Sequence, residues 1–150
     1  MSTTGSGAAP GAPVKGRIVA GVDGSDSSLL AARWAANQAR LTGSELRLVA
    51  AWNWPAMYGA VPAPGIDFEG DTRAVVAGIA DQLRQEFPGV GIEFDVVCGP
   101  AAQALIEASR DADLLVVGSR GHGAFSGMLI GSVSLHAVHH AHCPVLVMRT

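Results

Sequence analysis

The chain has 150 residues, of which 49% are hydrophobic and 15% are charged, and its net charge is −3 at pH 7. This length predicts one domain with a sizeable core, and the low share of charged residues favours a sheet whose central strands are covered on both faces. A slightly acidic chain lacks the basic footprint of a nucleic-acid-binding protein, so we expect no nucleic-acid partner.

The first fourteen residues differ in composition from the rest of the chain. They are rich in Gly, Ala, Ser, Thr and Pro and lack the charged and apolar regions of a signal peptide. We therefore expect a disordered tail over 1–14 and a single domain over 15–150. No uninterrupted apolar run is long enough to cross a membrane. The two cysteines, Cys98 and Cys143, do not indicate a secreted disulfide scaffold, and we expect a cytoplasmic protein with no membrane partner.

Short apolar runs then alternate with helix-compatible segments. The run 17–22 predicts a buried strand that ends at the turn Asp23-Gly24-Ser25. Ser25 or Asp26 is expected to cap a helix that runs to about residue 41. The apolar residues on or near one face of this helix are Leu30, Trp34 and Leu41.

The later elements follow the same alternation. Further strands are predicted at 46–51, 92–97, 114–117 and 144–148, and further helices at 71–87, 99–110 and 133–140. The strand 92–97 alternates between apolar and charged residues at its start, which is typical of a strand with one less covered face.

A long segment rich in proline and glycine, 53–70, has no hydrophobic periodicity and is predicted to be a loop. Trp52, Trp54 and Tyr58 stand at its start. These aromatic side chains either form a lid that stacks on a ligand or anchor the loop on the surface, and the sequence leaves both interpretations open.

Strands that alternate with helices predict a doubly wound parallel α/β sheet, in which ligands bind beyond the carboxyl ends of the strands. The most informative segment is the glycine-rich stretch 118–132, which joins the strand 114–117 to a helix. A strand, a glycine-rich loop and a helix N-terminus together present backbone N–H groups to an anion. We therefore expect this loop to cradle a phosphate.

The same stretch resembles a known family. Gly118-x-x-Gly121, nine residues and then Gly131-Ser132 match the nucleotide-binding signature of universal stress proteins. The start, 18–25, and the end, 143–149, are also similar to that family. The resemblance implies a Rossmann-like five-stranded parallel sheet in the order 3-2-1-4-5, of the adenine nucleotide alpha hydrolase type. It also implies a homodimer, for which we expect pairing through the last strand, Val145–Met148.

The resemblance further implies that the chain binds ATP, or AMP or cyclic AMP, since the loop does not choose among them. Asp23 matches the acidic residue beside the ribose and the metal-bridged phosphates, so a nucleotide-bound Mg²⁺ would lie near it. Ala51 matches a position whose backbone contacts the adenine, and Gly99 matches a glycine that lines the same crevice. The expected phosphate-binding residues are Gly118, Gly121, Gly123, Gly131, Ser132 and Val133.

Two side chains of the loop have no role fixed by the resemblance. Arg120 is the only cation near the loop, and we expect it to neutralise phosphate charge. His122 occupies a position that varies between relatives, and it is counted among the candidate site residues without an assigned role.

Several of these residues also have plain structural interpretations. Asp23 is a good turn former, and Ser132 is expected to be the N-cap of the helix after the loop. His136 and His140 have the spacing of a metal-binding helix face, but we favour surface histidines and expect no metal held by side chains. Cys98 is interpreted as either an inert or a redox-sensing thiol.

The sequence shows no Walker pattern and no assembled catalytic set, so at most slow hydrolysis is expected. The leading hypothesis is a dimeric nucleotide-binding module in a stress or signalling response. The alternatives are a dimeric scaffold with structural or no nucleotide, and a true ATPase.

Overall fold

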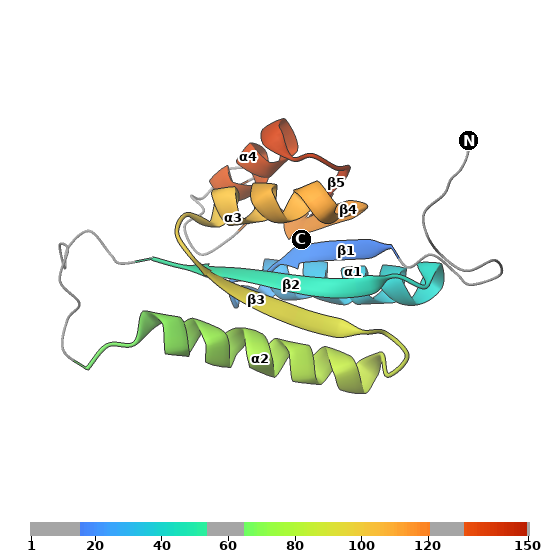
Figure 1. Ribbon diagram of the computed structural model, residues 1–150, viewed down its shortest axis with the longest axis horizontal. Coiled ribbons are helices and arrows are strands. Elements are labelled where there is room, and N and C mark those ends of the chain that lie inside the picture. The colour runs from blue at the N-terminus through green and yellow to red at the C-terminus, as the bar shows by residue number, and fades with distance from the viewer. Residues whose placement is uncertain (1–15, 54–64, 121–130, 150) are drawn as a thin grey trace.

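Five parallel strands form one sheet in the order β3-β2-β1-β4-β5. The computed structural model describes residues 16–53, 65–120 and 131–149 (Figure 1). The strands are β1 (Arg17–Gly21), β2 (Glu45–Trp52), β3 (Ile92–Cys98), β4 (Leu114–Gly118) and β5 (Val145–Met148). The doubly wound α/β architecture and its strand order, both predicted from the sequence, are confirmed.

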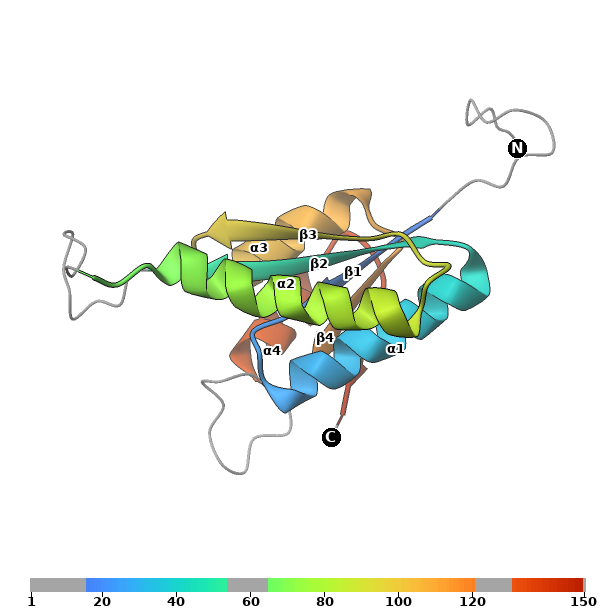
Figure 2. The same cartoon turned by 90° about the horizontal axis from the view of Figure 1, so that it is seen from below.

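Within the described residues, four α-helices connect the strands and cover the two faces of the sheet (Figures 1 and 2). They are α1 (Asp26–Thr42), α2 (Phe68–Glu86), α3 (Ala101–Ala108) and α4 (Ser132–His140), and a short 3₁₀ turn, Ser109–Asp111, follows α3. Helices α1 and α2 pack on one face and α3 and α4 on the other. No helix within the described residues is long and apolar enough to cross a membrane.

The central strands place alternate side chains in two cores. In β1, Ala20 belongs to the core beneath α1 and α2, whereas Val19 belongs to the core beneath α3 and α4. In β4, Val116 and Leu115 divide in the same way, and all four residues are buried. These strands read as continuous apolar runs in the sequence because each is covered on both faces.

Helix α1 packs through its small side chains, which corrects the expected apolar face. Leu30 and Leu41 are 44% and 63% exposed, and Trp34 is only partly buried. The buried residues of α1 are Ser27, Ser28, Ala31, Ala32, Ala35, Ala36 and Ala39. With no long side chain between helix and sheet, the backbone of α1 can lie close to the strands.

Helix α2 begins three residues before the predicted start at Asp71. Asp67 is its N-cap, and the carboxylate accepts a hydrogen bond of 2.9 Å from the N–H of Gly70. The predicted loop 53–70 therefore ends earlier than expected, and its part over 54–64 lies outside the described residues. Capping by Asp67 outweighs the low helix propensity of Gly70, which led the sequence analysis to place this residue in the loop.

Candidate functional site

The chain reverses its winding direction between β1 and β4, and a cavity lies at this point. β1 leads into α1 on one face of the sheet, whereas β4 leads toward α4 on the other. The cavity has a volume of about 260 Å³ and opens beyond the carboxyl ends of these strands. Its described lining residues are Gly21, Val22, Asp23, Ser28, Val49, Ala51, Ala101, Ala104, Leu105, Val117, Gly118, Arg120, Gly131, Ser132, Val133 and Ser134. The predicted residues Asp23, Ala51, Gly118, Arg120, Gly131, Ser132 and Val133 thus come together around one cavity.

Asp23 lines the cavity and also builds the turn after β1. Its Oδ1 accepts hydrogen bonds from the N–H of Ser25, at 2.9 Å, and from the Ser25 hydroxyl, at 2.5 Å. Ser25 in turn caps α1 by accepting from the N–H of Ser28 at 3.2 Å. Gly24 has a φ of 84°, which the tight turn requires. The turn-forming role of Asp23 is confirmed, and its place at the cavity keeps it a candidate ligand-binding residue.

Gly118 is a glycine because α1 approaches it closely. A Cβ at this position would lie 2.8 Å from the carbonyl carbon and 2.9 Å from the carbonyl oxygen of Ser27. It would also meet the Ser27 hydroxyl oxygen. Gly118 has no positive φ, so a left-handed backbone does not explain the glycine at this position. The absence of a side chain at 118 lets strand and helix backbones meet at the edge of the cavity.

The start of α4 differs from the sequence expectation in its N-cap residue and in its first helical residue. Gly131, not Ser132, is the N-cap, with an extended backbone at φ −75° and ψ 165°, and no side chain caps the helix. Ser132 is the first helical residue and is exposed. The N–H of Gly131 donates to the carbonyl of Ser119. The backbone N–H groups of the first turn of α4 therefore begin with Ser132. They lie at the N-terminus of the helix, which carries the positive end of the helix dipole.

The opposite wall of the cavity is apolar. Val49, Ala51 and Leu105 line it, and the Leu105 side chain fills the space over Gly21, where a Cβ would meet it at 2.9 Å. Ala101 and Ala104 of α3 also face the cavity. Sequence analysis missed this contribution of α3, although alanines three positions apart share a helix face. A polar rim and an apolar wall suit a ligand with an anionic end and a flat apolar part.

The remaining candidates lie outside the cavity lining or outside the described residues. Gly99 is not among the described lining residues; its N–H donates to the Trp52 carbonyl at 2.8 Å, and its φ is 134°. The positive φ accounts for glycine at this position. Gly121, His122 and Gly123 lie outside the described residues, as do Trp54 and Tyr58.

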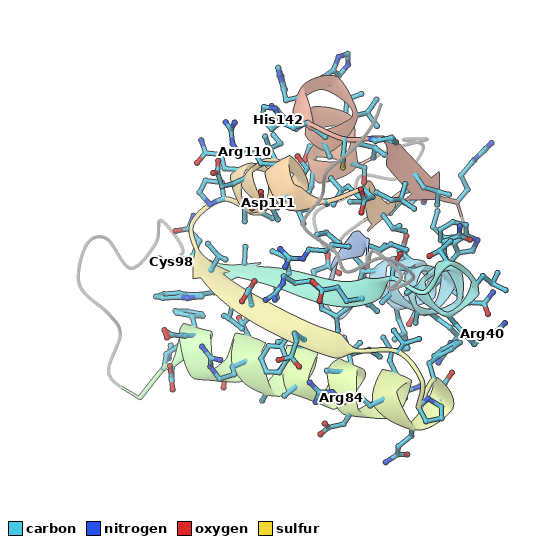
Figure 3. The ribbon with its side chains drawn as sticks, turned by 45° about the vertical axis from the view of Figure 1, so that its right-hand side comes forward. Arg40, Arg84, Cys98, Arg110, Asp111 and His142 are labelled. Carbon is cyan, nitrogen blue, oxygen red and sulfur yellow. The ribbon has the colours of Figure 1, made fainter. Side chains whose placement is uncertain are left out.

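Within the described residues, the histidines and Cys98 are exposed, whereas Cys143 is partly buried. The rings of His136 and His140 stack with centroids 6.1 Å apart on α4. Within the described ranges, no group of three or more metal-ligating side chains is placed to hold an ion. Cys98 is exposed at the carboxyl end of β3 (Figure 3). Burial, assisted by the negative charge of Asp113, raises the pKa of the Cys143 thiol.

The fold and the site define a doubly wound α/β protein with a cavity where the winding direction reverses, between β1 and β4. A family model, the Universal stress protein family, matches residues 16–149. Universal stress protein Rv2005c of Mycobacterium tuberculosis is 37% identical over 140 residues, which are 91% of this chain and 46% of the relative. The chain therefore belongs to the universal stress protein family, and it spans about half the length of the curated relatives it matches.

Solved structures of the family share this architecture. A universal stress protein crystallised in complex with cAMP is 29% identical, with a TM-score of 0.66 over 89% of this chain and 95% of that chain. UspA from Lactobacillus plantarum has a TM-score of 0.69 at 22% identity, over 91% of this chain and 100% of its own. The second likeness concerns the fold alone.

Proposed function

We propose that this chain is a nucleotide-binding module that holds an adenine nucleotide, specifically ATP, in the cavity between β1 and β4. The observation that carries the proposal is the convergence of Asp23, Gly118, Arg120 and Ser132 on one cavity with an apolar wall. These residues come from three separate segments of the chain: the turn after β1, the end of β4 and the start of α4. The cavity is the place where doubly wound folds bind ligands.

The two sides of the cavity suit the two ends of a nucleotide. The Arg120 side chain and the N–H groups that begin at Ser132 would neutralise and hold phosphate oxygens. The wall formed by Val49, Ala51 and Leu105 would pack on the adenine. A Mg²⁺ ion that arrives with the nucleotide would lie near the Asp23 carboxylate, an oxygen ligand of the kind magnesium prefers.

The family relationship supports an adenine nucleotide in particular. The relative with 29% identity was crystallised with cAMP, which shares adenine and ribose with ATP. The choice among ATP, AMP and cyclic AMP rests on the phosphate end of the ligand. We further propose that hydrolysis is at most slow and that nucleotide occupancy biases dimerisation or partner choice in a stress response.

A scaffold function is favoured by one separate observation. β5 is an edge strand of the sheet, and all four residues of Val145–Met148 are only partly buried. An exposed edge strand can pair with a second copy, which would hide its unpaired backbone groups. We therefore propose a homodimer through β5. In the scaffold interpretation this dimer forms whether or not nucleotide is bound.

The first test is to identify the nucleotide released from purified, denatured protein by mass spectrometry. Calorimetry with ATP, AMP, cyclic AMP and GMP then measures affinity in emptied protein. Ala101→Phe fills the cavity from α3 and should weaken binding by at least about tenfold, or 1.4 kcal/mol. Gln103→Phe is the control, because Gln103 is exposed on the same helix and does not line the cavity.

The outcomes separate the candidate functions. Adenine nucleotide binding that Ala101→Phe weakens by at least about tenfold and Gln103→Phe retains supports the module. Protein that is empty when purified and ignores all added nucleotides contradicts it. A dimer that persists in both variants, measured by light scattering, favours the scaffold, whereas a dimer that depends on nucleotide favours a switch. Turnover as fast as roughly 1 per second would instead indicate an ATPase.

A further inference from the structure

Three consecutive residues at the end of β4 are each held by a different partner. The carbonyl of Gly118 accepts a hydrogen bond from the Ser134 hydroxyl of α4. The carbonyl of Ser119 accepts from the N–H of Gly131. The N–H of Arg120 donates to the Ser27 hydroxyl of α1 at 3.4 Å. These bonds hold the segment 118–120, called the neck below, against the starts of α1 and α4.

The two serine hydroxyls at this neck are buried. Ser27 is 6% exposed and Ser134 is 4% exposed, and their helical neighbours toward the core include buried alanines such as Ala31 and Ala137. A buried hydroxyl is unfavourable unless it is hydrogen-bonded. Alanine would fill either position without that cost, so the hydroxyls are explained by the backbone groups that they bind.

The serines hold the neck from opposite faces of the sheet. Ser27 belongs to α1 on one face and Ser134 to α4 on the other. Ser134 is the third residue of α4, so its bond to Gly118 ties the helix-opening N–H groups directly to the strand end. The bond therefore joins the start of α4 to the strand end that leads to Arg120.

We propose that Ser134 and Ser27 are positioning residues that pre-organise the anion-binding end of the cavity. This inference rests on the proposed function, since it assigns these residues to the phosphate end of the same site. A site held in its bound geometry binds more tightly because less ordering is needed on binding. The benefit falls on phosphate-bearing ligands, because the apolar wall that would contact adenine is built by Val49, Ala51 and Leu105.

The test compares adenosine with AMP and ATP in calorimetry on wild type and variants. Ser134→Ala should weaken AMP and ATP binding by at least about fivefold, as expected for one net hydrogen bond, while adenosine affinity changes little. Ser27→Ala should act in the same direction with a smaller effect, because its bond to Arg120 is longer. Ser134→Thr keeps the hydroxyl and should restore most of the phosphate-dependent affinity.

Ser109→Ala is the matched control. Ser109 is fully buried, its hydroxyl donates to the Ile106 carbonyl at 2.6 Å and accepts from the N–H of His142 at 2.9 Å, and it does not line the cavity. Its loss should lower the melting temperature yet leave the AMP-to-adenosine affinity ratio unchanged. A ratio that falls in Ser134→Ala and not in Ser109→Ala supports positioning.

Two negative results have different meanings. Wild-type protein that binds none of the three probes overturns both the proposed function and this inference. Wild-type protein that binds normally, with an affinity ratio unchanged in both Ser134→Ala and Ser27→Ala, overturns the inference alone. If Ser134→Ala does not fold, the decision falls to Ser27→Ala and Ser134→Thr.

Discussion

Replacing Gly118 by alanine should destabilise the protein even when no nucleotide is present. The added Cβ would lie 2.8 Å and 2.9 Å from backbone atoms of Ser27, which cannot rotate away as a side chain can. To reach ordinary contact distances, α1 and β4 must separate by roughly half an ångström. Such overpacking costs about 1–3 kcal/mol, which corresponds to a melting temperature about 2–12 °C lower in a domain of this size.

Gly78→Ala provides a control of opposite sign. Gly78 lies within α2, it is exposed, and no atom would come within 4 Å of an added Cβ. Alanine is the better helix former, so this change should stabilise the protein by about 0.5–1 kcal/mol. The assay is urea denaturation of nucleotide-free protein, monitored by circular dichroism, with both variants and wild type side by side.

The opposite signs make the reasoning refutable. If Gly118→Ala unfolds at the same urea concentration as wild type, the close approach of α1 does not restrict residue 118. The glycine would then be explained by ligand approach alone, and the variant should lose nucleotide affinity without losing stability. A destabilisation of similar size in Gly78→Ala would show that the measured loss does not come from contact with Ser27.

Two further predictions concern thiol reactivity and the packing of α1. Iodoacetamide at pH 8 should modify the exposed Cys98 faster than Cys143, because burial and Asp113 raise the pKa of Cys143 and lower its thiolate fraction. Peptide mass spectrometry after timed quenching measures the two modification rates, and equal rates would contradict the prediction. Ala35→Leu should lose about 1–3 kcal/mol of stability by overpacking, whereas Leu41→Ser should stay within about 0.5 kcal/mol of wild type because Leu41 is 63% exposed. Thermal melts measure both changes. A larger loss in Leu41→Ser than in Ala35→Leu would show that the leucine face of α1 is the buried one.

The order of elements could be predicted from the sequence because strands covered on both faces leave an unmistakable apolar signal. Leu114–Val117 and Ile18–Val22 are of this kind, and both lie within or next to central strands. The strand order itself is not contained in such local patterns, and it followed only from the family resemblance. The start of α2 shows why helix ends are harder to predict: Asp67 is a favourable N-cap, but Gly70 within the first turn has a low helix propensity and suggests a loop on its own.

Part of the site could be predicted because its residues directly follow strands. Asp23 and Arg120 lie just past the carboxyl ends of β1 and β4, where a parallel sheet gathers its functional groups. The cavity wall from α3 could not be found in this way. Ala101 and Ala104 have no functional group that would mark them as site residues. They contribute to the site because their small side chains leave the cavity open.

The contact at Gly118 shows why a glycine motif alone does not reveal what its glycines do. A glycine serves either a positive φ or a close approach, and the approaching partner can be distant in sequence, as Ser27 is here. That approach depends on the small buried face of α1, where alanines such as Ala31 and Ala35 separate helix from sheet. Hydrophobicity ranks leucine above alanine, so the sequence pattern pointed to Leu30 and Leu41 instead. The face that appeared less apolar is the one that brings α1 close to the site, and it requires glycine at the end of β4.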